Sequence, residues 1–230
     1  MNFTDFLYYV FFTKQCPICK TPCLPQENFC EKCQSQIIFI HQINTCKICG
    51  LNNCISHKII PMYEELITVF QYDEVSKQSI LSFKFNNRKN LYKTFSKLMC
   101  DVIHQQYSHI EFDFITEVPM HKKKIVQRGY NQSALLAKSI SGVFDLFHSS
   151  DLLEKTSLGI AQHTLDLSQR LANPIGLFQV NPLSTVYNQT ILLIDDVFTT
   201  GSTINECAKQ LKLAGAKAVY CCVIATVSHK

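Results

Sequence analysis

The sequence lacks an apolar run long enough to cross a membrane. None of its apolar stretches reaches the roughly 18 residues that a spanning helix needs. The opening stretch MNFTDFLYYVFF is apolar, but no Lys or Arg precedes it and no small-residue cleavage site follows, which argues against a secretion signal. We expect this stretch to form a short helix lying on the domain, in a soluble cytoplasmic protein.

Strong charge and internal repetition are also lacking. The net charge is +4 over 230 residues, a mildly basic value that neither requires nor excludes a nucleic-acid partner. There are no repeats or low-complexity segments, and an apolar content of 47% excludes a disordered chain because it is enough for a real core. The length suits one domain of ordinary size, or one domain with a small appendage.

Cysteine, by contrast, is abundant and clustered. Eight of the 12 cysteines lie between Cys16 and Cys54, whereas a secreted disulfide scaffold would spread them through the fold. The clustering therefore indicates metal. Two C-x-x-C knuckles, Cys16-Pro-Ile-Cys19 and Cys30-Glu-Lys-Cys33, can supply four thiolates to a tetrahedral zinc ion.

A second set of ligands follows the first. It consists of Cys46, Cys49, Cys54 and His57, and Gly50 allows the backbone to turn under the metal. The two sets could bind in sequence or interleave, and the alternative to zinc is a small core of reduced thiols. Cys23 has no obvious partner, and Cys221 and Cys222 are most simply core residues. Zinc at such knuckles is structural by default, because the closed shell leaves no open coordination position.

Beyond Pro61 the pattern changes to alternating strands and helices. Strands are predicted at 66–72, 112–119, 191–194 and 216–227, and helices at 73–85, 90–107, 131–147 (with Asn131 as cap) and 201–215. Strand, loop, helix and strand in that order form a βαβ unit, hence a parallel α/β sheet. We expect a zinc-binding module at 1–60 and an α/β domain at 61–230.

The stretch ILLIDDVFTTGST, from Ile191 to Thr203, has the most specific chemistry. Ligands of parallel α/β sheets bind where strands end, and Asp195 and Asp196 directly follow the predicted strand. A Thr- and Gly-rich loop leading into a helix N-terminus is suited to a phosphate, because backbone N–H groups, hydroxyls and the helix dipole all favour an anion. The acids would then accept hydrogen bonds from vicinal sugar hydroxyls. The stretch therefore predicts a sugar phosphate.

This stretch resembles the phosphoribosyl-pyrophosphate signature of type I phosphoribosyltransferases, which have a parallel, Rossmann-like sheet. The resemblance implies that Asp195 and Asp196 hold the ribose 2′- and 3′-hydroxyls. It also implies that the loop wraps the 5′-phosphate; the residues of this binding stretch are Val197, Thr199, Thr200, Gly201, Ser202 and Thr203.

A wider resemblance, to the ComF/GntX family of competence-associated proteins, extends from Cys16 to about Val227. It rests on the knuckles, the FKF segment (Phe83, Lys84, Phe85), Val118-Pro119, the RGYNQ segment (128–132), Gln162, Arg170, Asn173, Phe178 and the IDDV-x-TTGST stretch. The chain departs from the family at Met120-His121, where a second proline is common, and at Lys155-Thr156, where an arginine is expected. The resemblance implies structural Zn²⁺ and Mg²⁺ with phosphoribosyl pyrophosphate. It also implies, as partners, single-stranded DNA and competence-machinery proteins, among them a helicase.

A basic segment follows the strand end at Pro119. Lys122, Lys123, Lys124 and Arg128 could form the loop that meets the pyrophosphate in related transferases, or a solvated basic loop. Arg128 is the strongest candidate, because its planar fork binds phosphate in bidentate fashion. Turnover stays open, since Thr199 stands where purine-salvage relatives have an acid.

A second basic segment interleaves cations with aromatic residues. The cations are Lys84, Arg88, Lys89, Lys93 and Lys97, and the aromatic residues are Phe83, Phe85, Tyr92 and Phe95. Such a pattern can bind single-stranded DNA, or it can be a helix pair with aromatic residues in the core. We expect a ComF-type protein acting in DNA uptake or the use of incoming single strands. The alternatives are a nucleobase-salvage phosphoribosyltransferase and a non-catalytic regulator that senses phosphoribosyl pyrophosphate.

Overall fold

A sheet of five parallel strands forms the centre of the molecule. The computed structural model describes residues 14–24, 26–40, 45–52, 54, 57, 59–85, 88–156 and 177–228. The strand order is β3-β9-β8-β4-β5, and every neighbouring pair is parallel. The strands are β3 (Glu65–Tyr72), β4 (Phe114–Glu117), β5 (Phe147–His148), β8 (Thr190–Phe198) and β9 (Ala218–Val227).

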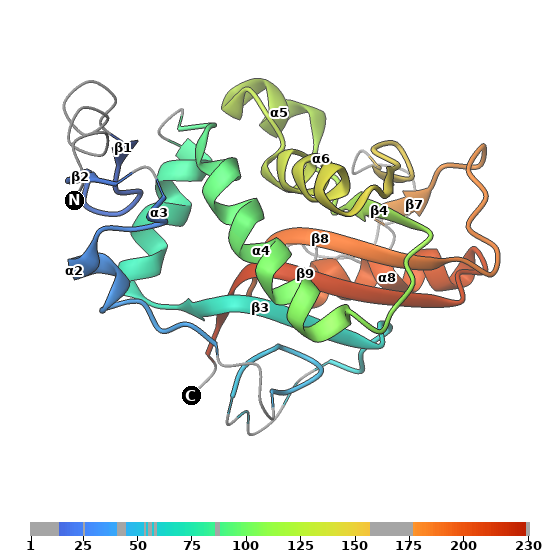
Figure 1. Cartoon of the computed structure of the whole chain (residues 1–230). Coiled ribbons are helices and arrows are strands. Elements are labelled where there is room, and N and C mark those ends of the chain that lie inside the picture. Colours follow the sequence, from blue (N-terminus) through green and yellow to red (C-terminus); the bar gives the residue numbers. More distant parts are fainter. Residues whose placement is uncertain are drawn as a thin grey trace.

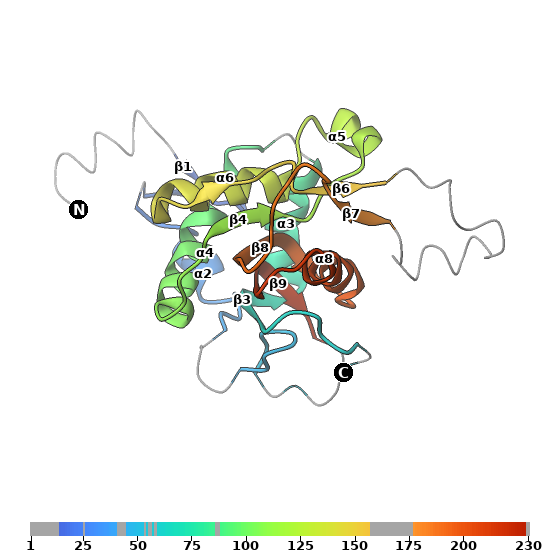
Figure 2. The same cartoon turned by 90° about the vertical axis from the view of Figure 1, so that its right-hand side faces the viewer.

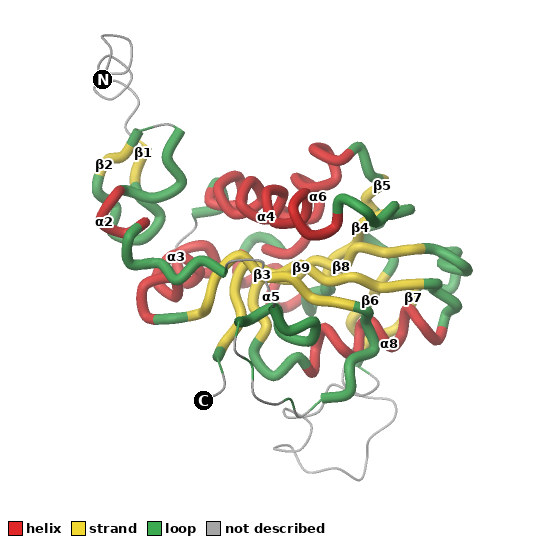
Figure 3. Tube along the Cα trace, turned by 60° about the horizontal axis from the view of Figure 1, so that its bottom comes forward, coloured by secondary structure: helices red, strands yellow, loops and turns green. Residues whose placement is uncertain are grey.

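Helices cover both faces of this sheet (Figures 1 and 3). One face packs against α3 (Glu74–Phe85), α4 (Leu91–Tyr107) and α6 (Gln132–Phe144), and the other against α8 (Ser202–Leu213). In β8, Leu192 and Ile194 belong to the first core whereas Ile191 and Leu193 belong to the second. The continuous apolar run of β8 therefore follows from burial on both faces.

Smaller elements complete the fold. Near the N-terminus, two short strands pair antiparallel beside a one-turn helix; they are β1 (Lys14–Gln15), β2 (Pro22–Cys23) and α2 (Glu31–Gln34). A second antiparallel pair lies beyond the sheet in Figure 2, and a short helix precedes α6; they are β6 (Leu153–Lys155), β7 (Phe178–Val180) and α5 (Lys122–Arg128). None of the described helices is long and apolar enough to cross a membrane.

The predicted elements are present, with three corrections. The helix predicted at 131–147 ends at Phe144, because Asp145 adopts the left-handed conformation (φ 53°), and β5 follows. The strand predicted at 191–194 continues to Phe198, so the acid pair lies within β8 rather than after it. The basic segment predicted as a loop is helix α5, started by the His121 ring, which accepts a hydrogen bond from the Lys123 amide. The helix predicted for the opening apolar stretch lies outside the described residues.

The first cysteine-rich segment packs against the α3–α4 face of the sheet. Phe29, Phe39, Phe70 and Phe95 form a chain of aromatic contacts with ring centroids 6.1 to 6.4 Å apart. This chain connects the segment to β3 and α4, and Cys16 is buried in the same core. The module and the sheet therefore share one hydrophobic core on this face.

The second cysteine-rich segment lies on the opposite face, below β3 in Figure 1. Cys49 and Leu51 share a core with Tyr63, whose hydroxyl donates to the Ile48 carbonyl at 2.7 Å. Gly50 has φ 72°, and a Cβ there would lie 3.0 Å from Thr68 on β3. Only glycine therefore suits both the turn and this close approach. A domain boundary at residue 60 stays a prediction.

Candidate ribose-phosphate site and cysteine clusters

The two adjacent acids occupy the carboxyl end of β8, at the centre of the sheet. Asp196 Oδ1 lies 2.8 Å from the ammonium of Lys84, at the end of α3. Asp195 Oδ1 accepts hydrogen bonds from the Ser133 hydroxyl at 2.9 Å and from the Asp196 amide at 2.8 Å. Two helices on the same face of the sheet therefore hold the pair, α3 through a charge and α6 through a hydroxyl.

The environment of the pair changes its acidity. Burial, together with the neighbouring Asp196 carboxylate, raises the pKa of Asp195 to about 7, against the opposing effects of its hydrogen bonds and Lys84. Near neutral pH Asp195 therefore carries only part of a negative charge. A site of this charge accepts hydrogen bonds from neutral hydroxyls more readily than it accepts a bare phosphate.

The loop after β8, where the sequence predicts a phosphate, turns at Gly201. Gly201 caps α8 with φ 78°, and a Cβ there would lie 2.5 Å from the Phe198 ring and 2.6 Å from Ile59. The Thr200 and Ser202 hydroxyls are hydrogen-bonded to each other at 2.9 Å and are partly or fully exposed. The first turn of α8 contains no acid, so the positive end of its dipole is not offset.

Segment 60–62 holds the start of α8 in place. The Asn205 side chain accepts from the Met62 amide at 2.7 Å and donates to the Ile60 carbonyl at 3.1 Å. The predicted phosphate loop is therefore fixed from both sides, by β8 and by the segment that follows the second cysteine cluster. Thr199 and Thr203 are exposed beside it, and Val197 is partly buried.

The FKF and RGYNQ segments form one wall of the site. The Tyr130 hydroxyl donates to the Phe83 carbonyl, and the two rings lie 6.0 Å apart. The guanidinium carbon of Arg128 lies 4.7 Å from the centre of the Phe85 ring, and its NH1 donates to Gln132 Oε1 at 3.2 Å. The predicted pyrophosphate residue Arg128 thus lies beside α3, on the side from which Lys84 reaches Asp196.

Sequence reasoning missed two residues that contact the acids. Lys84 was assigned to the basic–aromatic segment, and Ser133, just after the RGYNQ segment, had no assigned role. The FKF segment was the available signal for Lys84, but pairing with Asp196 depends on contact over 112 residues of chain. No local pattern could have found it.

Lys155, at the position where the resemblance leads us to expect an arginine, interacts electrostatically with Asp195. Burial and the Lys124 charge lower its pKa, while Asp195 works in the opposite direction. Its ammonium lies 5.0 Å from the centre of the Phe178 ring. The other predicted family positions nearby lie outside the described residues; they are Gln162, Arg170 and Asn173.

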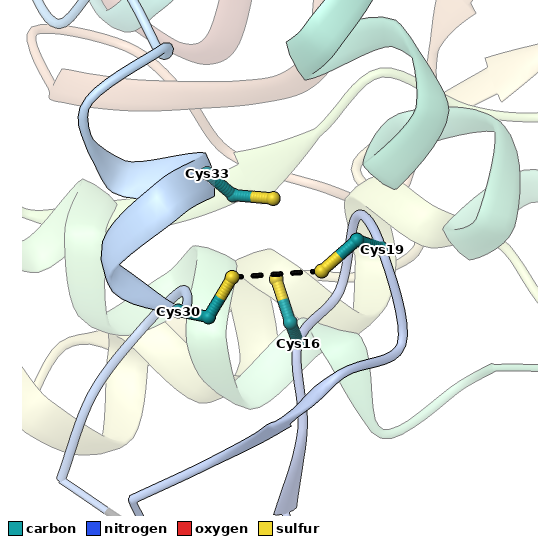
Figure 4. Close-up of side chains that lie close together, drawn as sticks. All are labelled: Cys16, Cys19, Cys30 and Cys33. Atoms are coloured by element: carbon teal, nitrogen blue, oxygen red, sulfur yellow. Dashed lines mark hydrogen bonds between the residues drawn. The ribbon is translucent and has the colours of Figure 1, made fainter.

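The first cysteine quartet converges on one point (Figure 4). The sulfur atoms of Cys16, Cys19, Cys30 and Cys33 all lie within 4.8 Å of one another, with Cys19 and Cys30 at 3.5 Å. Ligands of a tetrahedral zinc ion with Zn–S bonds of about 2.3 Å lie roughly 3.8 Å apart. The quartet therefore fits a metal ion such as zinc.

The second quartet converges in the same way. The ligand atoms of Cys46, Cys49, Cys54 and His57 lie within 4.8 Å of one another, and His57 Nε2 is 3.0 Å from Cys46 Sγ and 2.9 Å from Cys54 Sγ. The ligands are thus grouped in sequence order rather than interleaved. This quartet too could bind a metal ion.

The C-x-x-C knuckle that opens each quartet, at Cys16 in the first and at Cys46 in the second, has the same backbone turn. The backbone carbonyl of Cys16 accepts a hydrogen bond from the Lys20 amide, and the Cys16 amide donates to the Thr21 carbonyl. The backbone of Cys46 makes the same two hydrogen bonds with the Gly50 amide and the Leu51 carbonyl. Lys20 adopts φ 64° at the position that Gly50 occupies in the second quartet. Cys23 is buried outside both quartets, and Cys221 and Cys222 are fully buried in β9, as expected of core residues.

A basic groove of about 630 Å³ lies between the first cysteine module and α4. Its cations are Lys14, Arg88, Lys93 and Lys97, and no acid is among the described residues that line it. Phe83 and Phe95 are fully buried, so these predicted stacking residues belong to the core. The cations of the predicted basic–aromatic segment therefore lie in two places. Lys84 pairs with Asp196, whereas Arg88, Lys93 and Lys97 line the groove.

The chain is similar to a known domain family and to several known proteins. Residues 129–230 match the family model described as phosphoribosyl transferase domain. The DNA utilization protein YhgH of Escherichia coli K12 is 30% identical over 184 residues, which cover 76% of this chain and 80% of that protein. Competence protein F of Haemophilus influenzae is 25% identical over 222 residues, 91% of this chain and 95% of that protein.

Among solved structures, a glutamine phosphoribosylpyrophosphate amidotransferase of B. subtilis aligns with a TM-score of 0.43 at 16% identity. The alignment covers 63% of this chain and 30% of that larger enzyme.

These observations define a protein with a phosphoribosyltransferase-type domain on a parallel sheet and an N-terminal cysteine-rich segment suited to metal. The chain belongs to the ComF-type family of competence and DNA utilization proteins.

Proposed function

We propose that this chain binds phosphoribosyl pyrophosphate at the carboxyl end of β8 and acts in the uptake or use of single-stranded DNA. The supporting observation is the acid pair Asp195 and Asp196 near the end of β8, followed by a short loop into α8, whose first turn contains no acid. In this proposal the two carboxylates accept hydrogen bonds from the ribose hydroxyls. The 5′-phosphate lies in the cradle of Thr199, Thr200, Gly201, Ser202 and Thr203, beside Val197.

The proposed catalytic group consists of Asp195, Asp196 and Arg128. Mg²⁺ would enter with the pyrophosphate, whose charge it and Arg128 would offset during pentosyl transfer. No acid occupies the position of Thr199, so the chain itself offers no general base there, and the acceptor is left to experiment. A regulator that binds the ligand without turnover uses the same residues.

The basic groove supports the DNA part of the proposal. Lys14, Arg88, Lys93 and Lys97 could contact successive backbone phosphates, an interaction that depends on salt rather than on sequence. Nucleobase salvage is not favoured, because the relatives are DNA utilization and competence proteins. We place this activity, with proteins of the competence machinery as partners, in the cytoplasm.

Structural zinc at the two quartets completes the proposal. Each set offers four ligands in a closed arrangement, which suits a structural site because no coordination position is left for a substrate. The zinc-binding module would extend to residue 60 and the phosphoribosyltransferase domain from residue 61.

Replacing both acids by amides tests the ribose site. Asp195→Asn with Asp196→Asn keeps the side-chain shapes but removes the carboxylates, so we expect phosphoribosyl pyrophosphate with Mg²⁺ to lose measurable binding in calorimetry while circular dichroism stays native. The matched control is Glu111→Gln, an exposed acid at the opposite end of β4. Unchanged affinity in the double variant would refute the site.

The same pair of variants tests the biological role. In a DNA-uptake assay, the double variant should lose transformation whereas Glu111→Gln should keep it. Normal transformation by a variant that no longer binds the ligand would separate the ribose site from DNA use.

A further inference from the structure

The ion pair between Lys84 and Asp196 is a charged contact of the site to which the family resemblance assigned no role. Lys84 Nζ and Asp196 Oδ1 lie 2.8 Å apart, and the two side chains are 19% and 13% exposed. An ion pair withdrawn this far from water gains little net stability, because desolvation offsets the attraction. Its position at the acid pair suggests a role in ligand binding.

The position of Lys84 is held by its two neighbours. The Phe83 carbonyl accepts from Tyr130, and the Phe85 ring lies under Arg128. Both partners come from the RGYNQ segment, whose Asn131 caps α6 and donates to the Val118 carbonyl at 3.4 Å. The end of α3 is therefore fixed to the loop that leaves β4, and Lys84 and Arg128 lie on the same wall.

The two faces of the sheet assign an orientation to the ligand. The proposed 5′-phosphate loop leads into α8, which covers one face, whereas Lys84 and Arg128 approach from the α3–α6 face. The 1- and 5-substituents of a ribose lie on either side of the ring oxygen. A ribose on the acids with its 5′-phosphate at α8 therefore turns its 1-substituent toward α3 and α6.

We propose that Lys84 is a further ligand-binding residue, which donates to the pyrophosphate group of phosphoribosyl pyrophosphate while it stays paired with Asp196. An ammonium has three N–H donors, so one can remain on Asp196 while another meets a phosphate oxygen. Arg128, stacked on Phe85, supplies a second cation to the same group. This inference rests on the proposed function and adds the residue that distinguishes the pyrophosphate from a plain ribose phosphate.

The test compares two ligands on matched variants by calorimetry. Lys84→Met removes the ammonium and keeps most of the stem. Lys84→Arg restores a charge, and Lys77→Met removes a lysine two turns earlier on α3 that pairs with Glu74. The ligands are phosphoribosyl pyrophosphate with Mg²⁺ and ribose 5-phosphate, which lacks the pyrophosphate.

We expect Lys84→Met to weaken phosphoribosyl pyrophosphate binding roughly 10- to 100-fold, as for loss of a hydrogen bond to a charged group. Ribose 5-phosphate affinity should change little, Lys84→Arg should recover part of the loss, and Lys77→Met should match the wild type. An equal loss for both ligands would overturn the inference, since Lys84 would then act only by holding Asp196. An unchanged affinity of Lys84→Met for phosphoribosyl pyrophosphate would also overturn the inference. A wild type that binds neither ligand would instead refute the proposed function itself.

Discussion

At the residue scale, the acid pair shows how surroundings decide what a motif does. The sequence places two carboxylates side by side, but their charge depends on Lys84, Ser133 and burial, which come from distant parts of the chain. Burial and the neighbouring Asp196 raise the pKa of Asp195 to about 7.

This raised pKa predicts a pH-dependent stability. Folded Asp195 binds its proton more tightly than an ordinary aspartate of pKa 3.8, so the stabilisation is complete below about pH 4 and is lost as pH rises through 7. Asn cannot titrate. Between pH 5 and 8, the unfolding free energy of the wild type should therefore fall relative to Asp195→Asn by on the order of 2 kcal/mol.

Urea denaturation of both proteins at pH 5, 6.5 and 8 measures this difference. Glu111→Gln, which changes an exposed acid, should follow the wild type. Parallel curves for the wild type and Asp195→Asn would show that Asp195 titrates normally.

At the scale of elements, the β8–loop–α8 unit combines a buried strand with a turn that requires glycine at position 201. β8 continues past the apolar run because its acids are hydrogen-bonded and paired, so they can remain in the ladder at the strand end. Gly201 then starts α8 in a left-handed conformation that leaves no room for a Cβ. The order of elements was predictable from local pattern; the strand end was not, since it depends on partners from α3 and α6.

Replacing this glycine should damage the turn. Gly201→Ala would meet both an unfavourable φ and overlap with Phe198 and Ile59, so we expect a loss of about 2 kcal/mol in unfolding free energy. The control is Gly142→Ala in α6, where an added Cβ meets nothing within 4 Å and should stabilise by up to about 1 kcal/mol. Thermal melting compares the two, and equal midpoints would contradict the strain at Gly201.

At the scale of the whole molecule, the cysteine modules are part of the architecture rather than appendages. The first contributes Cys16 and Phe29 to the core of the α3–α4 face, and the second contributes Cys49 to the core of the α8 face. Arg88 NH1 donates to the Pro17 carbonyl at 3.4 Å, which connects the first module to the start of α4. The basic groove lies along this junction, with one wall from each part.

Loss of a proposed zinc ligand should therefore affect both stability and the proposed DNA binding. Cys16→Ser should lower the zinc content by one ion per chain, lower the melting temperature, and weaken the affinity for a labelled single-stranded oligonucleotide in anisotropy titrations. Cys23→Ala is the control, because Cys23 is buried outside both quartets and its loss should leave the zinc content unchanged. Wild-type protein without zinc would refute the metal assignment.

The sequence by itself determined the long strands and helices, the parallel α/β class, the cysteine quartets and the acid–loop stretch, because each depends on residue types at short spacing. Only the tertiary structure decided the partners. In the fold Lys84 pairs with Asp196, and the Ser133 hydroxyl donates a hydrogen bond to Asp195. Arg88 and Lys93 line a groove together with residues of the first cysteine-rich segment. Other parts of the fold have long-range contacts of the same kind. Ser96 and Ser139 are 43 positions apart, and Met62 and Asn205 are 143 positions apart. Packing of helices on a sheet selects such pairs, and no local spacing encodes them.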